Sequence, residues 1–261
     1  MNKYRNSTKQ VRHIARLDVK GADLIKGVHL EGLRKVGSPS EAALSYYQQG
    51  ADELIYIDLV ASLYGRSKLT SIVRKTTEDI FIPVTVGGGI RNCEDVEELL
   101  VSGADKVSIN TAIVHRPELI SEVANRFGSQ CLVASIEAKR NGNTENWNIL
   151  TDCAREVSNK EVVRWAQQCE ELGAGEILLT SVDREGTRKG FDVPLIKAVT
   201  DAVSIPVIVS GGFGEPVHIS ELSCSCSFDG VAFADALHFK RYTIGEIKSI
   251  SLENNISVRL E

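Results

Sequence analysis

Long apolar runs, an excess of positive charge and paired cysteines are all missing from this 261-residue sequence. No stretch approaches the roughly 20 consecutive apolar residues of a membrane-spanning helix. The 30 Lys and Arg against 35 Asp and Glu give a net charge of -5, which provides no broad basic surface for a nucleic acid. Residues 1–16 are basic but no apolar run follows them, so they do not resemble a secretory signal. We therefore expect a cytoplasmic protein with neither a membrane nor a nucleic-acid partner.

Metal-binding patterns are missing as well. None of the six cysteines belongs to a CxxC pair, and none of the five histidines follows HxxxH or HxxEH spacing. Those spacings are typical of zinc sites. We therefore expect no metal site, and reduced thiols that act as small core residues. The hydrophobic content of 43% allows a sizeable core without disulfide or metal cross-links.

An internal repeat is the most informative feature of the sequence. The segment Ile82-Pro-Val-Thr-Val-Gly-Gly-Gly-Ile90 recurs as Ile205-Pro-Val-Ile-Val-Ser-Gly-Gly-Phe213, and Gly50-Ala-Asp-Glu-Leu-Ile55 recurs as Gly173-Ala-Gly-Glu-Ile-Leu178. Both pairs are separated by the same number of residues, which is hard to produce by chance. The period is too long for a solenoid repeat. The sequence therefore indicates two halves of one design, at about residues 11–127 and 131–254.

Each half alternates short apolar, β-rich runs with amphipathic segments, which is typical of βα units around a parallel sheet. Eight strands are predicted, at residues 11–19, 53–59, 82–86, 106–109, 131–136, 176–180, 205–209 and 230–233. Helices are predicted at residues 39–49, 68–78, 93–102, 117–126, 160–172, 193–202, 216–223 and 244–254. The eight strands and the internal repeat favour a closed barrel over an open doubly wound sheet. We predict an α/β protein with one (β/α)8 TIM barrel domain over residues 1–261, and an inserted loop or hairpin at residues 141–158 on its catalytic face.

A glycine turn in each half is a candidate phosphate grip. In the first half, Gly88 and Gly89 end a strand, and the Asn110 amide and Thr111 hydroxyl can complete the grip. Glycines let backbone N–H groups approach an anion, although they can also serve only to make tight turns. Two such grips would hold a diphosphorylated small molecule across the barrel mouth.

The second grip contains Gly211 and Gly212, and it carries a conflicting residue. Asp235 follows the last strand at the position where this phosphate would bind. A carboxylate repels a phosphate dianion unless a cation intervenes. Either Asp235 turns away, or this site binds something other than phosphate.

Two acidic residues end facing strands of the predicted barrel, Asp18 in the first half and Glu137 in the second. Carboxylates on opposite sides of one mouth can hold different protonation states and act as acid and base. The alternative is a structural role, such as pairing with Lys20 or Lys139. Thr180, at another strand end, is a candidate for positioning the substrate.

Six segments resemble the cyclase subunit family of imidazole glycerol phosphate synthase. They are Leu17-Asp-Val-Lys20, Ile25-Lys-Gly27, Phe81-Ile-Pro-Val-Thr-Val-Gly-Gly-Gly-Ile90, Gly103-Ala-Asp-Lys-Val-Ser-Ile-Asn-Thr111, Gly173-Ala-Gly-Glu-Ile-Leu-Leu-Thr-Ser181 and Val258-Arg-Leu-Glu261. The resemblance covers nearly the whole chain. It implies a heterodimer with a glutaminase subunit, whose ammonia passes through the barrel. At the far end the ammonia attacks a phosphoribulosyl formimino carboxamide ribotide, without a cofactor, giving imidazole glycerol phosphate and an aminoimidazole carboxamide ribotide.

The resemblance also assigns roles to particular residues. It implies that Asp18 is catalytic, that Lys26 lies on the substrate side and that Asp105 contacts the glutaminase. We also predict that Gly186 binds phosphate together with Gly211 and Gly212. It further implies a ring of charges that gates ammonia at the barrel base, formed by Arg12, Glu53, Lys106 and Glu176. The same four charges could also serve only to cap the bottom of the barrel.

Three positions at the mouth depart from the family pattern. Glu137 stands where the family has its second catalytic aspartate, Glu185 replaces another aspartate, and Asp235 replaces a phosphate-binding serine. One added methylene moves a carboxylate by more than ~1 Å, which can cost about a hundredfold in rate. Three alternatives therefore stay open. They are a paralogue that passes ammonia to another acceptor, such as a sugar amidotransferase of surface polysaccharide biosynthesis, a noncatalytic ammonia conduit, and an unrelated phosphate-binding isomerase.

Overall fold

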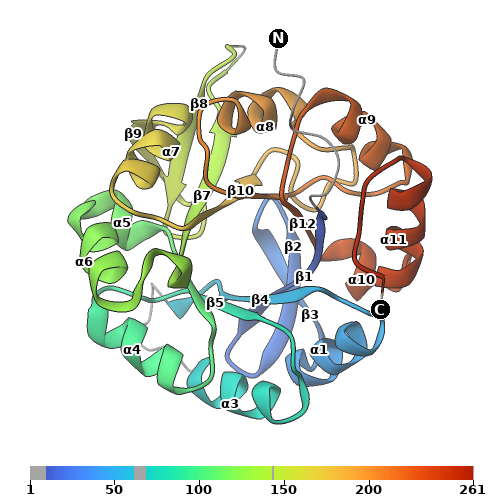
Figure 1. Ribbon diagram of the computed structural model, residues 1–261, viewed down its shortest axis with the longest axis horizontal. Helices are drawn as coiled ribbons and strands as arrows, with labels where there is room; N and C mark the ends of the chain where they lie inside the picture. The colour runs from blue at the N-terminus through green and yellow to red at the C-terminus, as the bar shows by residue number, and fades with distance from the viewer. Residues whose placement is uncertain (1–9, 62–68, 143, 261) are drawn as a thin grey trace.

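A closed barrel of parallel strands lies at the centre of the computed structural model, which describes residues 10–61, 69–142 and 144–260 (Figure 1). Within those residues, eight parallel strands pair in the order β10-β11-β12-β1-β4-β5-β6-β7, and β7 pairs with β10 to close the ring. Their bounds are β1 (Arg12–Lys20), β4 (Glu53–Asp58), β5 (Val84–Gly87), β6 (Lys106–Ile109), β7 (Leu132–Arg140), β10 (Glu176–Ser181), β11 (Val207–Ser210) and β12 (Gly230–Phe233). The predicted (β/α)8 barrel is confirmed.

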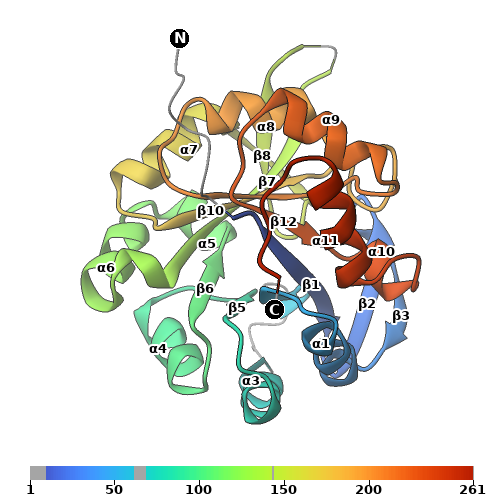
Figure 2. The ribbon, with the colours of Figure 1, turned by 45° about the vertical axis from the view of Figure 1, so that its right-hand side comes forward.

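Helices form an outer layer around these strands (Figures 1 and 2). Their bounds are α1 (Pro39–Gln48), α3 (Leu69–Asp79), α4 (Cys93–Val101), α5 (Thr111–His115), α6 (Glu118–Phe127), α7 (Val162–Glu171), α8 (Val193–Thr200), α9 (Val217–Ser225), α10 (Asp235–His238) and α11 (Ile244–Glu253). Residue 68, the predicted start of the second helix, lies outside the described residues. The apolar faces of the helices pack on the outward-facing strand residues and form one large core around Tyr56 and Trp165.

A β-hairpin extends the first strand of each half of the barrel. Strands β8 (Trp147–Thr151) and β9 (Glu156–Glu161) extend β7, as predicted for residues 141–158. Strands β2 (Asp23–Val28) and β3 (Glu31–Gly37) extend β1 in the same way. This first hairpin was not predicted, because β3 is largely exposed and has no apolar alternation. The short helices α5 and α10 also escaped prediction, since four or five residues carry no helical period.

Inward-facing side chains form layers along the barrel axis. Because alternate strand residues share a face, Arg12, Ile14, Arg16 and Asp18 of β1 follow one another from the N-terminal end to the mouth. The layer of Ile14 belongs to a second apolar cluster, which includes Ile55, Val133, Leu178 and Ile208. Charged and polar layers therefore lie at the two ends of the barrel, with an apolar layer between them.

Other features of the described residues bear on cofactors and location. All six cysteines carry free thiols. Over residues 10–61, 69–142 and 144–260 we find no group of three or more His, Cys, Asp or Glu arranged to hold a metal ion. None of the helices in the same ranges has the length and apolar character needed to cross a bilayer.

Candidate active site

A ring of four charged side chains closes the N-terminal end of the barrel. Arg12, Glu53, Lys106 and Glu176 are each the first residue of a barrel strand, so their side chains meet at the same end. Arg12 donates a hydrogen bond of 2.8 Å to Glu53 and pairs with Glu176, while Lys106 lies 2.9 Å from a carboxylate oxygen of each glutamate. Each charge thus has two partners of opposite sign. The ring predicted from the resemblance is present as a set of side-chain contacts.

The surroundings of the ring fit either a gate or a structural cap. Both glutamates are buried, whereas Arg12 and Lys106 are partly exposed. A cavity of about 300 Å³ opens beside Arg12, Lys106 and Glu176. Asp105 is exposed at the same end, where its carboxylate accepts a 2.8 Å hydrogen bond from the backbone N–H of Val84. Asp105 therefore also stabilises the pairing of neighbouring strands.

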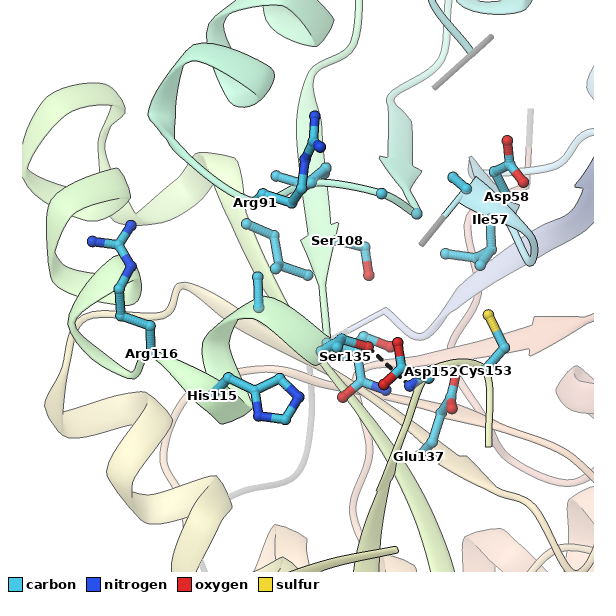
Figure 3. A pocket seen from close by; sticks show the side chains of 18 residues that line it. Ile57, Asp58, Arg91, Ser108, His115, Arg116, Ser135, Glu137, Asp152 and Cys153 are labelled. Atoms are coloured by element: carbon cyan, nitrogen blue, oxygen red, sulfur yellow. Dashed lines mark hydrogen bonds between the residues drawn. The ribbon is translucent and has the colours of Figure 1, made fainter. Parts of the chain in front are cut away.

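The opposite end of the barrel holds a pocket of about 380 Å³ (Figure 3). Gly88, Gly89, Asn110, Thr111 and Glu137 line it, so the structure brings the first predicted grip and one predicted acid/base residue together. This volume is typical of a small-molecule site. Packing alone also requires glycine in the turn, because a Cβ on Gly88 would lie 2.4 Å from a backbone carbonyl oxygen.

Three buried polar atoms in this pocket have no hydrogen-bond partner among the described residues. They are Oγ of Ser108, Oδ1 of Asn110 and Oε2 of Glu137. Buried polar atoms in proteins are nearly always hydrogen-bonded, so a cluster of unpaired ones marks a place for a polar ligand. Figure 3 shows Ser108 near the middle of the view, Glu137 at the lower right beside Asp152 and Cys153, and Arg116 at the left. The Thr111 hydroxyl accepts a 3.0 Å bond from a backbone N–H and keeps its own proton to donate.

The protonation of Glu137 is set mainly by its burial. Burial raises the pKa of Glu137 to about 7, although the charge of Arg16 and the backbone N–H of Ala154 favour the ionised form. A carboxyl group with a pKa near the working pH can both give and take a proton. Glu137 therefore has the properties of a general acid and base.

Asp18 is held differently, in a buried ion-pair network. Nε of Arg16 donates a 2.9 Å hydrogen bond to one carboxylate oxygen of Asp18, and Nζ of Lys26 lies 3.7 Å from the other. Burial acts to raise the pKa of Asp18, but the charges of Arg16 and Lys26 outweigh it, so this pKa lies below its usual range. Asp18 is therefore an ionised carboxylate beside Glu137, which can be protonated. The pKa values of the two carboxylates are therefore shifted in opposite directions, and their action as an acid/base pair stays a prediction.

Arg16 is a buried charged residue near the mouth that the sequence analysis did not select. Its guanidinium lies inside the barrel and also donates to the hydroxyls of Thr180 and Ser210, at 2.9 and 3.2 Å. Thr180, a predicted substrate-positioning residue, therefore binds a protein side chain. An arginine in the middle of an apolar strand was the available signal, because a buried charge requires partners.

A left-handed turn beside the pocket was also missed. Asp152, Cys153 and Ala154, between β8 and β9, all have positive φ angles, of 51°, 56° and 62°. Non-glycine residues avoid this conformation, which costs about 1–2 kcal/mol per residue. Asp152 and Cys153 line the pocket, and Ala154 supplies the N–H that reaches Glu137. The strained turn thus lies where backbone strain is common, at a functional site.

The second predicted grip forms a much smaller space. Gly186, Gly211, Gly212 and Asp235 line a cavity of about 20 Å³, separate from the first pocket. The carboxylate of Asp235 pairs with Arg241, and Nε of Arg188 lies 3.8 Å away. Cations therefore accompany this carboxylate, which is the condition expected for an anion site here. Lys26 pairs with Glu185 rather than pointing freely into the mouth.

Comparisons with known proteins agree with this arrangement. The chain matches the family described as histidine biosynthesis protein over residues 13–243. It is 64% identical over 205 residues to the imidazole glycerol phosphate synthase subunit HisF of Legionella pneumophila, an alignment that covers 78% of this chain and 96% of that protein. It is 45% identical over 265 residues to the subunit of the same name in Methanopyrus kandleri, covering 95% of this chain and 97% of that protein.

Proposed function

The chain belongs to the HisF family of imidazole glycerol phosphate synthase subunits. From this membership we propose which step of the reaction takes place at each end of the barrel. It is the synthase subunit, a lyase-type enzyme. Ammonia from a glutaminase subunit enters at the charged ring and leaves at the mouth. There it attacks the phosphoribulosyl formimino carboxamide ribotide, and the products are imidazole glycerol phosphate and an aminoimidazole carboxamide ribotide. One observation carries the proposal: a single closed barrel has a ring of salt-bridged side chains at one end and the pocket that contains Glu137 at the other.

The ring is suited to pass ammonia and not ammonium. Arg12 and Lys106 lie on its solvent side and repel a cation, and the next layer inward is apolar. A neutral molecule crosses that layer at far lower cost than an ion, because an unpaired charge in an apolar environment is strongly disfavoured. The ring opens when Lys106 leaves one of its two carboxylates.

The mouth provides anchoring and proton transfer. One phosphate of the substrate binds the backbone of Gly88 and Gly89 together with the side chains of Asn110 and Thr111. Glu137 exchanges protons with the reacting nitrogen, and Asp18 stays ionised and stabilises positive charge that develops there. Ammonia addition requires such a pair, because the nitrogen must lose protons after it attacks.

The second half of the mouth faces the other end of the substrate. Gly186, Gly211, Gly212 and Asp235 line its cavity, and Lys26 and Thr180 contact Glu185 and Arg16, respectively, at the same end of the barrel. Binding there requires a rearrangement, because the present cavity of about 20 Å³ has room for one water molecule and not for a phosphate.

The partner and the location follow from the same proposal. The glutaminase docks on the N-terminal end, where Asp105 is exposed beside the ring. The heterodimer works in the cytoplasm, with a phosphorylated small molecule as its substrate and without metal or organic cofactor, nucleic acid or membrane.

The decisive experiment supplies ammonium salts at alkaline pH to the purified protein together with the ribulosyl formimino intermediate. We expect release of imidazole glycerol phosphate without any glutaminase. Partner binding without turnover would refute the proposal, and would indicate a conduit or a paralogue with another ammonia acceptor. Activity on a different phosphate ester that is indifferent to ammonia would instead indicate an isomerase.

A further inference from the structure

The two phosphate grips at the barrel mouth are unequal in the space that they enclose. The first opens into about 380 Å³, whereas the second encloses about 20 Å³. A single water needs roughly 10–15 Å³ on such a scale, and ligand pockets begin at about 300 Å³. The internal repeat places a glycine turn in each half, so some feature of the second half reduces the space over its turn.

The side chain of Glu185 closes the second grip. Its carboxylate pairs with Nζ of Lys26, which also lies 3.7 Å from Asp18, and all three residues are buried. A Cβ built on Gly211, in the glycine turn itself, would lie 3.4 Å from Oε2 of Glu185. The Glu185 carboxylate therefore lies close to the glycine turn, and Glu185 lines the same small cavity.

The backbone of Glu185 is fixed by the β2–β3 hairpin. Its carbonyl accepts a 2.9 Å hydrogen bond from the N–H of His29. The next residue, Gly186, packs so closely on β2 that a Cβ there would lie 2.6 Å from the carbonyl oxygen of Gly27. The position of the carboxylate is thus set by the fold, and only its side-chain torsions are free to move it.

The buried charges that contact Glu185 through Lys26 balance one another, whereas Arg188 and Arg241 flank Asp235 on the lining of the same cavity. Arg16 and Lys26 are matched by Asp18 and Glu185, so this buried network is neutral. A phosphate dianion entering it would meet two carboxylates at close range, which is unfavourable unless one of them leaves.

We propose that Glu185 determines substrate specificity by acting as an internal substitute for the second phosphate. In the free protein its carboxylate holds Lys26, so one phosphoryl group binds at the first grip and a second binds only when Glu185 releases Lys26. This deepens the proposed function and rests on it, because it takes the first grip as the phosphate anchor. The affinity for the second phosphate then depends on how strongly Glu185 holds Lys26.

Calorimetric titration with inorganic phosphate, against chloride at matched ionic strength, tests the proposal. We expect one site in the wild-type protein and two in Glu185→Gln and in Glu185→Ala, because either change removes the carboxylate that holds the Lys26 ammonium. The second site in these variants should bind phosphate about tenfold to a hundredfold more tightly than any residual second binding in the wild type, the range of a charge-assisted hydrogen bond. Adding Lys26→Met to Glu185→Gln should abolish it, and Thr111→Val should weaken the first site only.

The outcomes separate this inference from the proposed function. Two phosphate sites of similar affinity in the wild type, no site at all, or one site in folded forms of both Glu185 variants would overturn the inference. If Glu185→Gln fails to fold, Glu185→Ala and the wild-type stoichiometry still decide. Turnover of the ribulosyl formimino intermediate by a wild type with two equal sites would leave the proposed function standing. The expected change from one site to two in a protein without turnover would refute the function alone.

Discussion

Replacing Glu137 with Gln should make the protein more stable at alkaline pH while removing its activity. Glu137 is buried, and its Oε2 has no hydrogen-bond partner among the described residues. Burial raises its pKa from 4.5 to about 7. The amide of Gln has nearly the same shape and never ionises, so the variant removes the cost of a buried charge without opening a cavity.

The size of the effect follows from the pKa of Glu137 in the two states. In the unfolded chain the carboxyl releases its proton near pH 4.5, and in the folded protein only near pH 7. The free energy of unfolding therefore falls as pH rises from about 4.5 to 7, and this loss is complete above pH 7. At about 1.4 kcal/mol per pH unit, the loss is roughly 3 kcal/mol, and Glu137→Gln should recover it.

Urea unfolding of both proteins at pH 5 and pH 8 measures this difference. We expect nearly equal stability at pH 5, and at pH 8 a gain for Glu137→Gln of roughly 3 kcal/mol, or on the order of 5–10 °C in Tm. Glu145→Gln is the matched control, because Glu145 is exposed in the adjacent β7–β8 hairpin. Equal pH dependence in the wild type and Glu137→Gln would show that Glu137 ionises normally. Turnover should fall about a hundredfold or more, because the amide cannot exchange a proton.

Three further variants test the other assignments. Asp18→Asn should abolish ammonia-dependent turnover, measured with ammonium salts, and full activity in this variant would contradict the acid/base assignment. Lys106→Ala should leave ammonium-driven turnover intact but uncouple glutamine consumption from product formation. The measurement is the ratio of glutamate to imidazole glycerol phosphate released by the heterodimer. A ratio unchanged from wild type would show that the ring only caps the barrel. Arg16→Gln should move the acidic limb of the pH–rate profile to higher pH, because the positive charge of Arg16 lowers the pKa of both Asp18 and Glu137. An unshifted limb would exclude this electrostatic role.

The strands were predicted to within about two residues at most ends, because strands buried on both faces are continuous apolar runs. β6 and β12, for example, have their predicted bounds. The β2–β3 hairpin was missed because β3 lies mostly in solvent and its sequence shows no period. Periodicity reports burial, so exposed elements leave little trace in it.

The candidate site was only partly predictable. Gly88, Asn110 and Glu137 were each selected from their places at strand ends, but nothing local shows that they line one pocket. Arg16 was passed over because its partners Thr180 and Ser210 are 164 and 194 residues away in the chain. The sequence indicated a glycine turn in each half and a conflicting Asp235 in the second, but it did not indicate the ion pair of Glu185 with Lys26 beside the second turn.

The amino-acid sequence by itself determined the barrel, its twofold design and which end each charged residue occupies, because alternation and strand position depend on near neighbours alone. Tertiary structure decided which polar atoms are satisfied, which carboxyl group has a raised pKa and which half of the mouth is open. Those properties depend on burial and on partners from distant strands, and they exist only once the barrel has closed.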